Sequence, residues 1–169
     1  MASQKNDYQE LLKQAETDLG DKLLESGMNY GYPLFLIRPE DVVEVGRYFK
    51  DNHHFIYLVD VTGTDRFTTE DRFEVIYNVI SLRTHQRIFI KTRLEEDEPE
   101  LDSVFEVWEA ANWHEREVYD MFGISFKNHP DPRRIYMPED FRYYPLRKEF
   151  PLLGVPGSIE LPNTTPDQD

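Results

Sequence analysis

The stretch SVFEVWEAANWHEREVYDMFGISFKNHPDPRRIYMPEDFRYYPLRKEF, residues 103–150, decides how the chain is organised. It contains both tryptophans of the chain, and at Gly123 it changes from an amphipathic pattern to a proline-rich one. Before Gly123, apolar residues recur at three- and four-residue spacing, which predicts a helix from Ser103 to Phe122. Ser103 and Glu106 match a capping box at its start, and Gly123 is a favourable residue just past its end.

Two side chains of this predicted helix lie on unexpected sides. At about 100° per residue, Glu115 falls in the middle of the apolar stripe, where a carboxylate is costly unless it is paired. Trp113 falls on the opposite side, among Glu109, Glu117 and Asp120. One interpretation pairs Glu115 with an arginine inside the domain and treats Trp113 as an isolated surface aromatic. The other is a helix that packs the domain on one side and a partner protein on the other.

The segment after Gly123 predicts an extended arm that docks on another protein. Its five prolines prevent a long helix, but it is rich in aromatic residues, which disordered linkers lack. Residues 126–150 contain six basic and four acidic residues, so they are net positive in a chain of net charge −14. We therefore expect an α/β domain at 1–122 that ends in this helix, a docking arm at 123–154 and a flexible C-terminal tail at 155–169.

The residues before 103 predict the rest of a small domain of the α/β class (α+β type). Apolar residues at helical spacing, up to Leu19 and Leu23, predict one or two short helices within 7–26, and a second apolar stripe predicts a helix that ends at about Lys50. Apolar runs predict about four strands, at 32–37, 54–62, 72–82 and 86–94, and the run at 72–82 alternates in part.

The expected arrangement of these elements follows from short connections and from proline. Short connections favour a mostly antiparallel sheet with helices packed on one face and a long extended C-terminal arm. Pro33 suggests that the first strand is at an edge, and the unbroken apolar run at 54–62 suggests a central strand. The acidic run at 95–102 predicts a solvated loop.

Composition argues against several classes of function. A net charge of −14 argues against nucleic-acid binding, which requires the neutralisation of phosphates. No apolar run approaches the roughly 18 residues that a membrane span needs. The chain has no cysteine, so disulfides and the usual thiolate ligation of iron–sulfur clusters are excluded.

A stand-alone carboxylate enzyme is the weakest interpretation of the acidic helix. Glu117 and Asp120 share one side of it, but Glu115 points away from them. His114 and His129 have no His-x-x-x-His or cysteine partner for a metal. No glycine-rich loop follows a strand to hold a nucleotide.

Residues 115–138, EREVYDMFGISFKNHPDPRRIYMP, resemble the signature of the 30 kDa (C-type) subunit family of proton-pumping NADH–quinone oxidoreductase (respiratory complex I). Residues 137–152 also resemble the arm of that family, and the likeness extends more loosely over the α/β domain. Pro132 and Tyr136 stand where the family pattern leads us to expect aliphatic residues. The matching residues are Glu115, Arg116, Glu117, Asp120, Met121, Phe122, His129, Arg133, Arg134 and Ile135.

This resemblance implies a non-catalytic subunit in the peripheral arm of the complex, on the cytoplasmic side of the cell inner membrane. Such a subunit braces the large (D-type) quinone-site subunit beside iron–sulfur subunits, in electron transfer from NADH to quinone coupled to proton translocation. It touches the membrane only through the complex and binds no nucleic acid. The resemblance also implies no catalytic residue, metal or cofactor on this chain, with FMN and iron–sulfur clusters on its partners.

The resemblance further implies which residues form contacts with neighbouring proteins of the complex. Charge pairs of Glu115, Arg116, Glu117 and Asp120 would fix the junction of helix and arm, and the two arginines at 133 and 134 would meet carboxylates or carbonyls of the neighbour. The implied interface residues are Trp113, Glu115, Arg116, Glu117, Asp120, Phe122, His129, Arg133, Arg134, Tyr136 and Arg147. The equivalent subunit of a membrane-bound hydrogenase or of a ferredoxin-driven complex stays open as an alternative.

Overall fold

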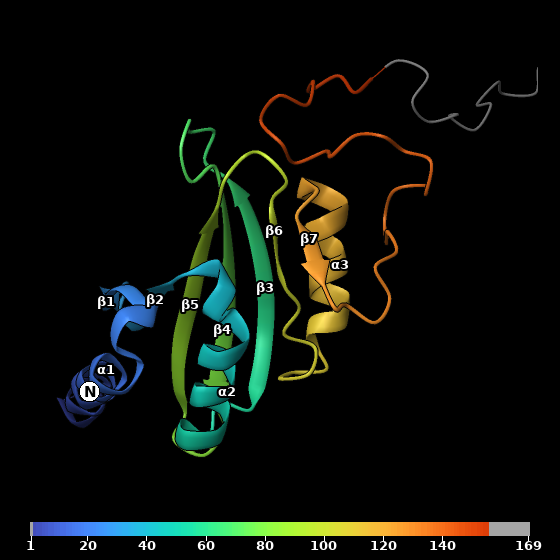
Figure 1. Ribbon diagram of the computed structural model, residues 1–169. Helices are drawn as coiled ribbons and strands as arrows, with labels where there is room; N and C mark the ends of the chain where they lie inside the picture. The colour runs from blue at the N-terminus through green and yellow to red at the C-terminus, as the bar shows by residue number, and fades with distance from the viewer. Residues whose placement is uncertain (1, 156–169) are drawn as a thin grey trace, which may run out of the picture.

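The computed structural model describes residues 2–155, and its main sheet has five strands (Figure 1). These are β1 (Leu23–Asn29), β2 (Tyr32–Ile37), β3 (Tyr57–Asp65), β4 (Phe73–Ser81) and β5 (Gln86–Leu94), in the spatial order β1-β2-β5-β4-β3. The α-helices of the described residues are α1 (Ala2–Leu19), α2 (Val42–His53) and α3 (Ala111–Phe122). A second sheet pairs β6 (Glu100–Asp102) with β7 (Ser125–Lys127), and 3-10 turns cover Gly20–Lys22 and Pro39–Asp41.

The main sheet is mostly antiparallel, as predicted, with one strand more than expected. Only β2 and β5 pair in parallel within it, with Leu34 opposite Phe89. One face of β4 is buried at every second residue from Phe73 to Ser81, because period-two alternation sends these side chains to the same side. That face packs on the helices, where the Phe35 and Phe49 rings lie 4.7 Å apart between β2 and α2. The apolar stripe predicted for the second helix is confirmed in α2.

The N-terminal region differs from the prediction of helices within 7–26. Helix α1 ends at Leu19, because Gly20 adopts a left-handed conformation with φ of +53°. Leu23 is already extended and begins β1, which pairs with β2. The helical spacing of Leu19 and Leu23 was therefore a coincidence across two different elements.

Two strand positions also differ from the prediction. Strand β2 is not at the edge, since β1 covers it; its pairing with β5 begins only at Leu34, so Pro33 removes no hydrogen bond on that side. Strand β3 is not central but stands last in the order. Its Leu58 and Val61 side chains are nevertheless buried, and α3 packs against the strand: a methyl group on Gly63 would lie 2.7 Å from the Phe122 ring.

Helix α3 begins eight residues later than the capping-box pattern predicted. Its N-cap is Ala110, and residues 103–110 form turns, because the Ser103 hydroxyl and the Val104 N–H bond to the Glu115 carboxyl instead of capping a first turn. The acidic run before it is not wholly a solvated loop. Its last three residues form β6, with Leu101 buried.

The arm (residues 123–154) contains β7 and, from 128 onward, only turns and irregular backbone. Figure 1 shows it in orange to red, returning along α3, passing over the end of that helix and approaching the end of β3. None of the helices in the described part of the chain combines the length and the apolar character that a membrane span requires. The tail expected at 155–169 lies, apart from residue 155, outside the described residues.

Candidate functional site

The junction between α3 and the arm is the candidate site, and Asp120 is its first attachment point. Asp120 is fully buried, and its Oδ2 accepts hydrogen bonds from the backbone N–H groups of Ile135, Tyr136 and Met137 at 3.0, 2.6 and 3.0 Å. Its Oδ1 accepts one from the Arg134 guanidinium at 2.7 Å. Burial alone would raise the pKa of Asp120, but these donors outweigh it and lower the pKa. The ionised carboxylate therefore holds one turn of the arm.

Arg116, one helical turn before Asp120, holds the neighbouring part of the arm. Its guanidinium donates to the carbonyl oxygens of Arg133 and Arg134 at 2.8 and 3.1 Å, and lies 3.4 Å from the Asp131 carboxylate. It also stacks over the Trp113 ring, 4.9 Å from the centroid. Arg116 thus binds the arm on one side and stacks on the exposed Trp113 indole on the other.

Arg147 attaches the arm to the C-terminal end of α3. Its Nε donates to the carbonyl of Phe122 at 2.6 Å, where a helix leaves carbonyls without partners and favours a cation. Gly123 ends the helix in a left-handed conformation with φ of +72°. A methyl group on Gly123 would lie 2.5 Å from the Tyr144 ring, so glycine is required here by both backbone and space.

A buried ion pair in the sheet provides the last attachment. The Arg72 guanidinium donates to both oxygens of Asp65, at 3.0 and 2.9 Å, and pairs with the Glu149 carboxylate of the arm. The backbone N–H of Lys148 donates to Asp65 at 2.9 Å. Burial would raise the pKa of Asp65, but Arg72 and the N–H groups of Lys148 and Phe67 lower it to about 2. The end of the arm is therefore held by the connection between β3 and β4.

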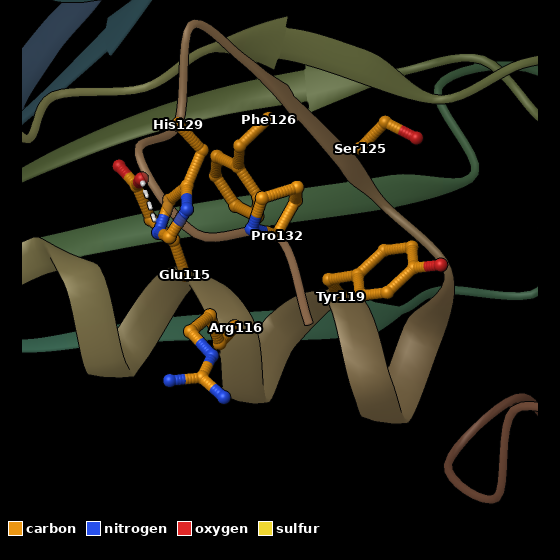
Figure 2. A pocket seen from close by; sticks show the side chains of 7 residues that line it. All are labelled: Glu115, Arg116, Tyr119, Ser125, Phe126, His129 and Pro132. Atoms are coloured by element: carbon orange, nitrogen blue, oxygen red, sulfur yellow. Dashed lines mark ion pairs between the residues drawn. The ribbon is translucent and has the colours of Figure 1, made fainter. Parts of the chain in front are cut away.

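Beneath the start of the arm, α3 and residues 125–132 enclose a cavity of about 270 Å³, lined by Glu115, Arg116, Tyr119, Ser125, Phe126, His129 and Pro132 (Figure 2). Glu115 is fully buried and accepts hydrogen bonds from the Ser103 hydroxyl at 2.5 Å and the Val104 N–H at 2.8 Å. Burial raises the pKa of Glu115 to about 7 against these two bonds. The expected arginine partner is wrong, because no arginine among the described residues forms an ion pair with this carboxyl.

The predicted interface residues fall into two groups, those with contacts inside the chain and those that face solvent. Of the four residues expected to fix the junction by charge pairs, Arg116 and Asp120 pair with Asp131 and Arg134 of the arm. Glu115 has uncharged hydrogen-bond donors instead, Arg134 meets its own Asp120 rather than a neighbour, and Arg147 donates to a backbone carbonyl. Phe122 packs in the core, and the His129 imidazole is buried near Glu115. The other group faces solvent: Trp113 (63% exposed), Tyr136 (61% exposed), Arg133 and Glu117.

The sequence pattern missed three residues of this junction. Asp65 was assigned to a loop and Arg72 to the start of the strand at 72–82, and no spacing rule links either residue to Lys148. Ser103 was assigned to a helix cap. The one available signal was Glu115 itself, because a carboxylate on a core-facing line requires a donor from elsewhere. Within the described residues, no three His, Asp or Glu side chains lie close enough together to hold a metal ion.

Comparisons with known proteins agree on one family. The model of the 30 kDa subunit of respiratory-chain NADH dehydrogenase matches residues 35–155. The chain is 46% identical over 137 residues to a C-type subunit of NADH-quinone oxidoreductase, the second of its kind in Rhizobium etli, and the match covers 80% of this chain and 73% of that relative. It is 44% identical over 119 residues to the C-type subunit of NADH-quinone oxidoreductase from Geotalea uraniireducens, covering 70% and 73%.

Two solved structures resemble the fold. A trypsin-resistant fragment of Nqo5 superposes with a TM-score of 0.63 at 32% sequence identity, over 73% of this chain and 97% of that one. A chain of the membrane-bound sulfane sulfur reductase, an archaeal respiratory membrane complex, superposes with a TM-score of 0.73 over 86% of each chain. Its sequence identity is 23%, so this second likeness concerns the fold alone.

Proposed function

The chain belongs to the 30 kDa subunit family of respiratory-chain NADH dehydrogenase and is a subunit of NADH–quinone oxidoreductase; from this premise we propose that it acts as a non-catalytic brace in the peripheral arm of the complex. Its arm docks on the large quinone-site subunit, with iron–sulfur subunits as neighbours. FMN and the iron–sulfur clusters belong to those partners, and the chain lies on the cytoplasmic side of the membrane.

The observation that carries this proposal is how the arm is held. Asp120 and Arg116 bind mainly its backbone, and Arg147 ties it to the Phe122 carbonyl, so most of its apolar side chains take no part in these attachments. Tyr136 is 61% exposed, Tyr143 43% and Leu146 52%. Large aromatic groups on a preorganised backbone are favoured interface anchors, because little side-chain freedom is lost on binding.

The charge of the arm supports the same partner class. A net positive segment favours a docking surface that carries carboxylates, whereas two copies of this chain, each of net charge −14, repel each other as whole molecules. Arg133 lies on the exposed side of the arm and pairs with both carboxylate oxygens of Asp131, at 2.6 and 2.8 Å, so contact with a carboxylate of the neighbour would share or replace this pair.

The test is purification of the tagged chain from its native membranes in mild detergent, with the double variant Tyr136→Ser and Tyr143→Ser. The unmodified chain is expected to bring down flavin and iron–sulfur subunits with NADH–quinone reductase activity, and the double variant to lose them. Tyr30→Ser is the matched control, since Tyr30 is 97% exposed at the turn between β1 and β2. Equal recovery with all three proteins would refute the docking role, and recovery of hydrogenase subunits would identify the alternative complex.

A further inference from the structure

The carboxyl of Glu115 has an unusual environment for a buried acid. Its side chain has no exposed surface, and its two hydrogen-bond donors, the Ser103 hydroxyl and the Val104 N–H, are both uncharged. An ionised carboxylate in such a place lacks both water and a counter-ion, which makes the charged form costly.

His129, from the arm, is the nearest titratable group, but it does not act as a counter-ion. Its Nε2 lies 3.8 Å from the Glu115 carboxyl, within ion-pair distance. Its Nδ1, however, accepts a hydrogen bond from the backbone N–H of Asp131 at 3.0 Å, so the ring proton is on Nε2, which faces the Asn112 carbonyl at 3.1 Å. Protonating Nδ1 would place its N–H opposite the backbone N–H of Asp131, so that two donors would face each other without an acceptor. Burial and the nearby Arg116 charge lower the pKa of His129, so the ring stays neutral.

The remaining elements packed around Glu115 also leave it without a positive charge. On its own helix, the Arg116 guanidinium points away from the Glu115 carboxyl, toward the Asp131 carboxylate and two carbonyls of the arm (Figure 2). From β4, the fully buried Tyr77 hydroxyl interacts electrostatically with Glu115, and burial together with the Glu115 charge raises the pKa of Tyr77. Tyr77 is therefore neutral, and its hydroxyl has no hydrogen-bond partner in the described part of the chain.

The backbone N–H of Ser103 donates to the Lys127 carbonyl at 2.8 Å, which ties the residues held by Glu115 to the start of the arm. We propose that Glu115 is a proton-operated latch: as a neutral acid it holds residues 103–105, and through them the start of the arm at residues 125–132, closed over α3, and as a carboxylate it loosens both. The cavity beside it gives this change a route, because its volume of about 270 Å³ has room for water around an ionised carboxylate. The proposal concerns the chain by itself and does not depend on where the arm docks.

The direction of the pH dependence follows from linkage. Burial raises the pKa of Glu115 from 4.5 to about 7, so the closed state keeps its proton where an opened state has already lost it. Closure is therefore fully favoured below pH about 4.5 and is weakened as the pH rises to about 7, by up to about tenfold in the equilibrium constant per pH unit. Above about 7 the dependence ends.

The decisive experiment is a ¹³C NMR titration of the full chain labelled at glutamate side-chain carboxyls, from pH about 4 to about 9. One carboxyl is expected to titrate near pH 7 in the wild type. It should be missing in Glu115→Gln, which keeps the volume of the neutral acid, and present in Glu117→Gln, the matched control at an exposed position of the same helix. Titration of every glutamate below pH about 5.5 in the folded wild type would overturn the proposal, and this outcome needs no variant.

Hydrogen exchange tests the mechanical half of the latch. After correction for intrinsic exchange rates, protection of the Val104 amide and of the amides in 125–132 should fall by up to about tenfold between pH 6 and 8 in the wild type and in Glu117→Gln. In Glu115→Gln it should be independent of pH. Protection that changes equally in all three proteins would show that Glu115 does not operate the closure.

Discussion

The main sheet and the arm lie in contact in the same molecule but are held by different kinds of interaction. In the sheet, β4 pairs along its whole length with β3 and β5 and buries every second side chain, so its stability is spread over many residues. The arm has no ladder beyond β7, and its position depends on Asp120, Arg147 and the Asp65–Arg72 pair. Damage to the sheet should therefore unfold the domain, whereas damage to the arm should release a segment and leave the domain folded.

The largest effect is expected from Phe49→Ala, which tests the core that α2 forms with the main sheet. Phe49 is fully buried between Phe35 and Phe55, so removing its ring leaves a cavity and should cost about 4 kcal/mol of unfolding free energy. Denaturant unfolding followed by circular dichroism measures this. The control Tyr30→Ala, at an exposed position, should change the free energy of unfolding by less than about 0.5 kcal/mol. If Phe49→Ala released the arm and left the sheet folded, the distinction between the two regions would be wrong.

Asp120→Asn should have the next largest effect and should act mainly on the arm. It leaves the Arg134 guanidinium, 8% exposed, without its counter-ion and weakens three hydrogen bonds to the arm backbone, at a cost of about 3 kcal/mol. Trypsin should then cleave after residues 133 and 134 much faster, with the circular dichroism of the sheet unchanged. Glu117→Gln is the control, and equal cleavage of the two variants would refute the assignment of Asp120 as the main attachment.

Acid should release the end of the arm with a smaller effect. The pKa of Asp65 is lowered from 3.8 to about 2, so its contribution is present above pH about 4 and is lost as the pH falls through 2, on the order of 2 kcal/mol. Unfolding measured at pH values between about 4.5 and 2 should show this loss in the wild type. Asp65→Asn should lack that part of the pH dependence, and an identical slope in both proteins would count against the ion pair as an anchor.

Tyr143→Ser should have the smallest effect on the isolated chain. Its ring is 43% exposed and touches Phe141 and Phe150 at 5.5 and 6.3 Å between centroids, so the unfolding free energy should change by about 0.5 kcal/mol at most. A strong loss of stability would show that this ring stabilises the arm itself and is not reserved for a partner.

The parts of the fold that depend on local spacing were predictable from the sequence. The stripe of α2 and the alternation of β4 each record which way a side chain points within one element, and both are confirmed. Strand β3 was predicted to be central but lies at the edge of the sheet. An edge strand that is covered by α3 has the same apolar sequence as a central strand, so the sequence does not distinguish the two. Leu19 and Leu23 share helical spacing, but the left-handed Gly20 between them separates a helix from a strand.

The candidate site was predictable in its residues and not in its pairings. The acids and arginines of α3 and the arm were identified, because charges beside a core-facing stripe are conspicuous. Their partners depend on the path by which the arm folds back over α3 and the sheet. Asp120 accepts a hydrogen bond from Arg134, and Asp65 accepts one from the backbone N–H of Lys148. Such pairings arise from the path of an irregular segment, for which no periodicity exists.

The parallel pairing of β2 with β5 has a consequence for how the chain acquires its structure. The β1–β2 hairpin and the β3–β4–β5 meander each form from neighbouring segments, but Leu34 can meet Phe89 only after α2 and two strands have been brought round. Loop closure of this kind is entropically expensive and slows folding, in proteins dominated by such contacts to milliseconds or seconds. We therefore expect the rate-limiting step of refolding to be the joining of these two preformed units along β2 and β5, with the arm settling afterwards.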